Sequence, residues 1–85
     1  MYRIKITAAA QKDLLSLKNQ KKYFDRIKSI IISLGHKPRP SGIKKLTQKE
    51  GYRIRVGNYR ILYQIDDEDK LIYIFRIRHR SDVYR

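Results

Sequence analysis

An alternation of apolar and polar residues runs from position 52 to position 63 and predicts two adjacent β-strands. It is interrupted by Gly57-Asn58, a dipeptide typical of two-residue hairpin turns. A turn of this length fixes the register of the hairpin, so we expect Arg55 opposite Arg60. The face expected to join the core consists of Tyr52, Ile54, Val56, Tyr59, Ile61 and Tyr63, and the other face of Arg53, Arg55, Arg60, Leu62 and Gln64.

The expected register brings two arginines together. Like charges directly opposite each other destabilise a sheet, so we expect an anion to lie between Arg55 and Arg60. The distribution of basic residues supports this interpretation, because seven arginines and one lysine follow position 50, whereas lysine predominates before it. A guanidinium is planar and can hold a phosphate through two parallel hydrogen bonds.

The first half of the chain shows one strand pattern and two helix patterns. Residues 2–7 alternate enough to form a strand, and Thr7 is placed to cap a helix over residues 8–18. A second amphipathic helix is expected over residues 21–34, and Gly35 is expected to end it.

The connections to the sheet are less regular. Residues 43–46 form either one helical turn or an extended link, and residues 66–69 form an acidic turn that we expect to be solvated. A last strand is expected over residues 71–78. A three-residue loop before it would place Arg76 opposite Arg60. The core side of this strand would then consist of Tyr73, Phe75 and Ile77.

The order of these elements predicts an α+β fold: an N-terminal strand, a helical hairpin and a three-stranded antiparallel meander. A four-stranded antiparallel sheet would then carry both helices on one face and leave the other face open and basic. A length of 85 residues suits one domain, so we expect residues 1–85 to fold as a single unit.

Composition narrows the class of partner. The formal charge is +13, from 21 Lys and Arg against eight Asp and Glu, which indicates a polyanion such as nucleic acid, an acidic protein, or both. The chain has no cysteine, so disulfides and cysteine-based zinc sites are excluded and a cytoplasmic location is permitted. No apolar run approaches the roughly 18 residues of a membrane span, and the N-terminus reads as a strand rather than a signal peptide.

Residues with usable chemistry are concentrated after position 50. Metal-free RNA cleavage needs a base for the 2′-hydroxyl, cations for the charge on the phosphate, and an acid for the leaving 5′-oxygen. A histidine titrates near neutral pH, which suits His79 to proton transfer, and neighbouring arginines would favour the phenolate of Tyr84. The candidate site consists of Arg53, Arg55, Arg60, Arg76, Arg78, His79 and Tyr84.

Other motifs add little. Lys44 and Lys45 are either contacts to an RNA backbone or a solvated pair. No Walker loop, HExxH or GxSxG pattern is present, and the sequence indicates neither a metal site nor a cofactor. Composition and spacing alone therefore define a binder of RNA or phosphate on an open sheet.

The run from Gly51 to Tyr63, followed by Arg78-His79-Arg80 and Val83-Tyr84, resembles the RelE/ParE superfamily of toxins from type II toxin–antitoxin systems. The resemblance covers nearly the whole chain. Its RelE branch implies a toxin that enters the ribosomal A site and cleaves messenger RNA without a metal, through attack by the 2′-hydroxyl. The catalytic residues that it implies are Arg53, Arg55, Arg60, Arg78, His79 and Tyr84, with Lys44, Lys45, Arg76 and Arg80 contacting RNA.

The resemblance also implies alternatives and partners. A ParE-like toxin would share the fold and poison DNA gyrase, and an inert relative would bind RNA without cutting it. The combination of Arg60, His79 and Tyr84 favours the nuclease. Arg53 stands where relatives often have lysine, and it cannot be the base because a guanidinium stays protonated, so that role falls to His79 or Tyr84. The implied partners are an acidic antitoxin, the ribosome and messenger RNA.

Overall fold

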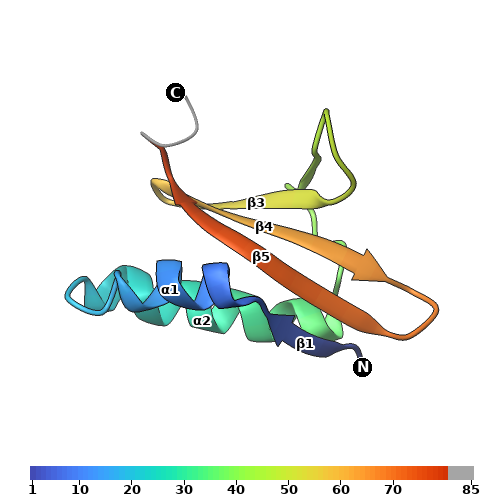
Figure 1. The fold of residues 1–85 in the computed structure, drawn as a ribbon, viewed down its shortest axis with the longest axis horizontal. Coiled ribbons are helices and arrows are strands. Elements are labelled where there is room, and N and C mark those ends of the chain that lie inside the picture. Colours follow the sequence, from blue (N-terminus) through green and yellow to red (C-terminus); the bar gives the residue numbers. More distant parts are fainter. Residues whose placement is uncertain (81–85) are drawn as a thin grey trace.

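The computed structural model describes residues 1–80, which form two helices and one five-stranded sheet (Figure 1). The strands lie in the order β1-β5-β4-β3-β2. In chain order the elements are β1 (Arg3–Ile6), α1 (Ala8–Leu15), α2 (Lys21–His36), β2 (Lys44–Lys45), β3 (Tyr52–Val56), β4 (Tyr59–Asp66) and β5 (Leu71–His79).

Both helices pack on the same face of the sheet, and the loop between β2 and β3 lies on the opposite side (Figure 1). The apolar stripes of the helices and the alternate residues of β4 and β5 form one core between them. Its fully buried large side chains are Tyr63, Ile27, Leu34, Ile61, Ile72, Ile74 and Val56. The α+β class and the helix-covered face are therefore confirmed.

The hairpin of β3 and β4 also matches the expectation. Arg55 pairs with Arg60 and Val56 pairs with Tyr59, so the connection is the two-residue turn Gly57-Asn58. Gly57 has a φ of 60°, in the left-handed region, where glycine is tolerated best. A side chain there would also meet the ring of Tyr23, since a Cβ at this position would lie 2.7 Å from the nearest ring carbon.

The prediction of four antiparallel strands was wrong in two respects. β1 pairs with β5 in a parallel sense, and residues 44–45 form a short fifth strand, β2, against β3. The direction of β1 depends on tertiary packing. The chain passes directly from β1 into α1, and both elements pack along β5. Local alternation reports which face a residue takes, but not which neighbour or direction a strand selects.

The register expected for β5 was also wrong. Arg60 faces Arg78 instead of Arg76, and Tyr73 lies opposite Gln64 on the open face. Two added residues explain the shift. The turn between Asp66 and Leu71 has four residues, and a bulge in β5 adds another opposite Leu62/Tyr63.

Local polar geometry accounts for the longer turn. The Oδ1 atom of Asp66 accepts a hydrogen bond from the backbone N–H of Asp69 at 3.0 Å. Lys70 then adopts a φ of 55°, in the left-handed region. The extra turn residue moves Tyr73 to the face opposite the one expected. The bulge adds a second residue, which returns the following part of β5 to the expected face, so Ile77 is buried as predicted.

The helix ends differ from the expected ones. Thr7 caps α1, as predicted, by accepting a hydrogen bond from the N–H of Ala10 at 3.2 Å, but α1 ends at Leu15. Gly35 does not end α2, which continues to His36. Instead, its missing side chain admits the N-terminal strand: the N–H of Tyr2 donates to the Gly35 carbonyl at 2.8 Å, and a Cβ would lie 2.9 Å from the Tyr2 carbonyl oxygen.

Asp13 on α1 completes the edge of β5 beyond the end of β1. Its Oδ2 atom accepts hydrogen bonds from the backbone N–H of Ile77 at 2.9 Å and from Nε of Arg76 at 2.8 Å. The side chain of Asp13 is only 19% exposed. One carboxylate therefore satisfies an edge N–H and pairs with the arginine next to the bulge.

We expect Asp13→Ala to lower the free energy of unfolding by about 2–3 kcal/mol, because it leaves a partly buried N–H and a guanidinium without this acceptor. Chemical denaturation measures the change. Asp25→Ala on the exposed side of α2 is the matched control and should cost less than about 0.5 kcal/mol. Equal losses in the two variants would contradict the capping role of Asp13.

Candidate nucleic-acid interface

Three arginines form a row across the open face of the sheet. Arg55 of β3 pairs with Arg60 of β4, and Arg60 pairs in turn with Arg78 of β5. Adjacent strands lie about 4.8 Å apart, so three arginine positions follow one another across the sheet. Nε of Arg55 also donates to the Gly57 carbonyl at 3.4 Å. We call Arg55, Arg60 and Arg78 the arginine row.

A second row lies beside the first. Lys44 of β2 pairs with Arg53 of β3, and Arg53 pairs with Leu62, which pairs with Arg76. The structure thus brings Arg53 and Lys44 next to the arginine row. Arg76 occupies the same cross-strand row, but its guanidinium forms an ion pair with Asp13 of α1 at 2.8 Å.

The arginine row concentrates positive charge. Within residues 1–80, neither Arg55 nor Arg78 forms an ion pair with a carboxylate, and the same holds for Arg53. Side chains on an open face keep their reach into solvent, where a phosphate group can approach. The arrangement can therefore bind an anion and stabilise negative charge that develops on it.

His79 lies on the other face of the sheet. It pairs with the buried Tyr59, and the two rings meet edge to face with centroids 4.9 Å apart. It lines a cavity of about 200 Å³ together with Asp13, Gln20 and other residues. The structure therefore does not bring His79 into the arginine row.

The remaining candidates are distributed as follows. Lys45 is exposed and pairs with Tyr52 at the edge of the sheet. Arg80 is exposed just beyond β5, and its N–H donates to the Asn58 carbonyl at 2.6 Å, which places it beside the hairpin turn. Tyr84 lies outside the described residues.

Sequence reasoning missed two aromatic residues of the open face, because it assigned Tyr73 and Phe75 to the core. Tyr73 pairs with Gln64, and the Nζ atom of Lys49 lies 4.8 Å from the centroid of the Phe75 ring. Both rings are half-buried. A signal was available in the spacing of Ile74 and Ile77, which are three residues apart and can share the core face only across a bulge.

A second missed feature fixes the turn between β4 and β5. Arg39 donates to both carboxylate oxygens of Asp67, at 2.9 and 3.3 Å, and Tyr2 donates to Oδ1 at 2.6 Å. The hydrogen bonds from Arg39 and Tyr2 lower the pKa of Asp67 to about 2. The bond to Asp67 in turn raises the pKa of Arg39. We call this contact the Arg39–Asp67 clip.

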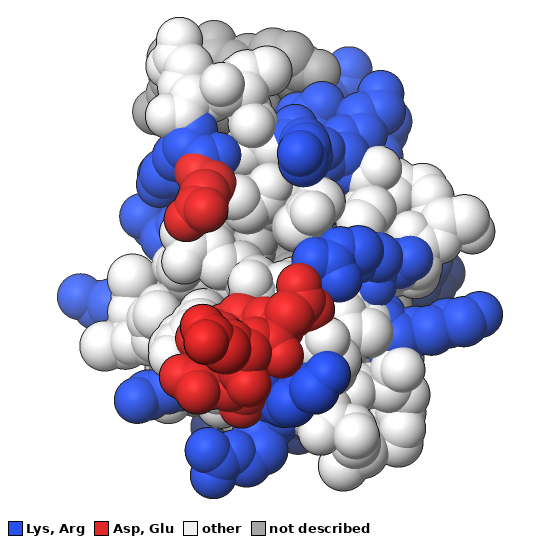
Figure 2. All heavy atoms as spheres, turned by 90° about the vertical axis from the view of Figure 1, so that its right-hand side faces the viewer, with Lys and Arg blue, Asp and Glu red and all other residues white. Residues whose placement is uncertain are grey.

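Figure 2 shows that acidic atoms gather on the end of the molecule that carries this turn, with basic side chains around them. Half of the eight Asp and Glu residues lie in positions 66–69. Among residues 1–80, no three His, Asp or Glu side chains are placed to hold one metal ion. No helix in that part of the chain is long and apolar enough to cross a membrane.

Comparison with known proteins assigns the family. Residues 4–84 match the family model described as the ParE toxin of the type II toxin–antitoxin system parDE. The chain is a toxin of the RelE/ParE superfamily. It is 32% identical to toxin RelG of Mycobacterium tuberculosis, in an alignment covering 99% of this chain and 97% of the relative.

Solved toxin–antitoxin complexes share the fold of this toxin. The RelBE2 complex of Mycobacterium tuberculosis matches with a TM-score of 0.77 and 30% identity, covering 93% of this chain and 98% of the matched one. The archaeal RelE–RelB complex of Pyrococcus horikoshii matches with a TM-score of 0.78 and 30% identity, covering 94% and 96%. The resemblance seen in the sequence is thereby confirmed at the level of the superfamily.

We expect inorganic phosphate to stabilise this toxin through the arginine row, because an anion offsets the repulsion among its guanidinium groups. The midpoint of thermal unfolding should rise by several degrees in phosphate, at constant ionic strength. Arg55→Gln should lose most of this rise, whereas Arg26→Gln, which removes the same charge from the exposed side of α2, should keep it. The same rise in all three proteins would show that phosphate acts through net charge alone.

Proposed function

We propose that this toxin is a ribosome-dependent, metal-independent endoribonuclease that cleaves messenger RNA in the ribosomal A site. The observation that carries the proposal is the arginine row, in which Arg55, Arg60 and Arg78 stand in register on the sheet face opposite the helices. Such a row can surround one phosphate with fixed donors. In phosphate-ester cleavage, negative charge grows on the non-bridging oxygens, where fixed donors contribute most.

The proposed reaction begins when the 2′-hydroxyl loses its proton and its oxygen attacks the adjacent phosphorus. The bond to the 5′-oxygen then breaks, and that oxygen takes up a proton. Arg60 and Arg78 hold the charged phosphate, while Arg55 and Arg53 flank it. Lys44, Lys45, Arg76 and Arg80 contact the RNA backbone, with Arg76 contributing less because Asp13 already pairs with it.

The proton transfers need a residue other than arginine, since a guanidinium stays protonated. His79 and Tyr84 are the two candidates. His79 contacts Tyr59 on the helix-covered face, which favours a supporting role for its ring. We therefore propose Tyr84 for the proton transfer, since a tyrosine that has arginines as neighbours loses its proton more readily.

The proposed partners follow from charge and from the solved relatives. The matched complexes contain RelB antitoxins, and this toxin carries a formal charge of +13. We propose that an acidic antitoxin covers the arginine row and that the ribosome and messenger RNA are the targets. A cytoplasmic location goes with these partners.

A gyrase-directed activity is the second candidate function. The observation that favours it is the match to the ParE family model over residues 4–84. Such an activity would not need donors placed around a single phosphate. An inert RNA-binding relative is the remaining alternative, and it would retain the basic face without any cutting.

Arg60→Lys separates charge from geometry at the centre of the row. It keeps the positive charge but loses the forked donor pair, so we expect cleavage of ribosome-bound messages to fall by about 10²-fold or more. Binding to ribosomes should change little, because binding follows the summed charge. Single-turnover cleavage and ribosome co-sedimentation measure the two effects.

Arg26→Lys is the matched control, since Arg26 is exposed on α2 and far from the row in the chain. It should cleave at the wild-type rate. Tyr84→Phe should lower cleavage by a similar factor, because it removes the hydroxyl proposed to transfer the proton and keeps the aromatic ring. Full cleavage by a folded Arg60→Lys, Tyr84→Phe double variant would refute the roles proposed for these residues.

Expression in growing cells distinguishes the candidate functions. For the nuclease we expect growth arrest with loss of protein synthesis and with cuts that map within translated codons. Arg60→Lys should relieve the arrest at an equal protein level. Broken DNA with intact messages would instead support the gyrase-directed activity, and continued growth would support the inert RNA binder.

A further inference from the structure

A hollow lies at the edge of the sheet beyond the start of β3. β3 begins at Tyr52, opposite Tyr63, so β4 continues past it for residues 64–66. The hollow has a volume of about 760 Å³ and lies between the β2–β3 loop and the turn after β4. The residues that carry the argument are Lys45, Lys49, Gln64, Asp66, Glu68 and Tyr73, all of which line it.

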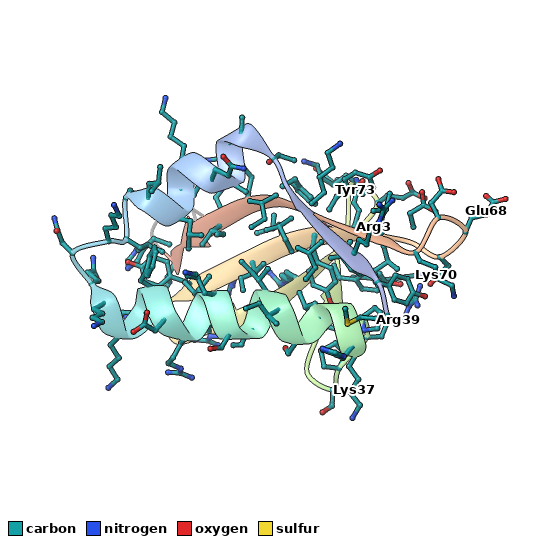
Figure 3. All side chains as sticks on the ribbon, turned by 90° about the horizontal axis from the view of Figure 1, so that it is seen from below. Arg3, Lys37, Arg39, Glu68, Lys70 and Tyr73 are labelled. Atoms are coloured by element: carbon teal, nitrogen blue, oxygen red, sulfur yellow. The ribbon has the colours of Figure 1, made fainter. Side chains whose placement is uncertain are left out.

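The walls of the hollow are held in place before any ligand binds. On one side, Nε2 of Gln64 donates to the Glu50 carbonyl at 3.2 Å, which ties the β2–β3 loop to β4. On the other side, the Arg39–Asp67 clip fixes the turn between β4 and β5. Figure 3 shows Arg39, Glu68 and Tyr73 at the same end of the molecule. A preformed site loses less entropy on binding.

The hollow and the arginine row are connected by β4, since Gln64 lines the hollow and Arg60 belongs to the row. Gln64 lies on the same strand and the same face as Arg60, four residues further on, which is about 13 Å at the rise of a β-strand. A stacked RNA strand covers that distance in about four nucleotides at ~3.4 Å each, and a stretched strand in fewer. A strand that places one phosphate on the arginine row therefore has a nearby nucleotide within reach of the hollow.

The charges in the hollow suit a nucleobase better than a phosphate. The arginine row is purely cationic, but here the carboxylates of Asp66 and Glu68 stand among lysines. Carboxylates repel a phosphate and accept hydrogen bonds from the amino groups of bases, while lysines donate to ring nitrogens and carbonyl oxygens. Tyr73 adds an aromatic face on which a base can stack.

We infer that this hollow binds one nucleobase of the RNA strand whose phosphate lies on the arginine row. The inference rests on the proposed function, since it takes RNA as the ligand of that row. Lys49 lines the hollow, and its Nζ atom lies 4.8 Å from the centroid of the Phe75 ring of β5. Its side chain therefore extends from the hollow over the strand that also carries Arg78 of the arginine row. The hollow would give the toxin a preference for particular bases at one position near the cut.

The test measures the cleavage rate after one base is removed from the message, in the wild type and in a variant without the side chains proposed to contact that base. Ribosomes carry a set of messages, each with one abasic nucleotide within four positions of the cleavage site. We expect wild-type cleavage to fall by about tenfold or more for one abasic position. The double variant Lys49→Ala, Glu68→Gln should cut the unmodified message more slowly and show no further loss at that position.

The control is Lys22→Ala, Asp25→Asn, a pair exposed on α2. Both double variants keep the net charge of +13, so bulk electrostatics are matched. The control should retain the full abasic penalty. An equal penalty in the wild type and in the Lys49→Ala, Glu68→Gln variant, or no penalty at any position, would overturn the inference.

Two outcomes separate this inference from the proposed function. Binding of a short RNA with a 2′-deoxy nucleotide at the cleavage position is measured alongside cleavage, with and without the abasic change. In one outcome the wild type cuts no message and still binds the base-containing RNA more tightly than the abasic RNA, with this difference lost in the Lys49→Ala, Glu68→Gln variant. In that case the nuclease proposal fails and the base-binding role of the hollow is supported. If the variant loses antitoxin binding while its abasic penalty is unchanged, the hollow is a protein-docking site and the inference fails.

Discussion

The extra residue in β5 sets which side chains at the end of this strand face the helices and which face the other side of the sheet. Ile74 and Ile77 are three residues apart, so an uninterrupted strand would put them on opposite faces. With the bulge, both are buried, and Arg78 comes into register with Arg60. The buried isoleucines favour the bulge by removing apolar surface from water, and the arginine row forms as a consequence.

The polar groups that follow the bulge, the Ile77 N–H and the Arg76 guanidinium, take their hydrogen-bond acceptor from α1. β1 ends before it can cover the last part of β5, and a bare strand edge there would leave the Ile77 N–H without a partner in a partly buried place. Asp13 supplies the acceptor and also pairs with Arg76. The same helix residue thus supplies an acceptor at the sheet edge and an ion-pair partner for Arg76 in the second row.

The open face is electrostatically costly to a domain of this size. Small domains bury a limited share of their surface and have little stability in reserve, so repulsion among closely spaced arginines is significant. Phosphates or carboxylates that bind on this face reduce the repulsion among the arginines. Their binding is more favourable for that reason. This connects the stability of the toxin to the binding of anions on its basic face.

Much of this toxin could be predicted from its sequence, because the deciding signals are local. Alternation and the Gly57-Asn58 turn determined the pairing of Arg55 with Arg60, and apolar stripes determined which faces the helices bury. The features that depend on contacts between distant parts of the chain could not be predicted in this way. The direction of β1, the role of Gly35 against Tyr2, and the position of His79 behind the sheet all depend on which elements pack together. The partner of Arg60 changed from Arg76 to Arg78 because a hydrogen-bonded turn and a bulge each added one residue. Such additions leave the alternation within each strand segment intact while they shift one strand against the other. Alternation therefore does not fix the register, and the packing of β5 against β4 and the helices decided it.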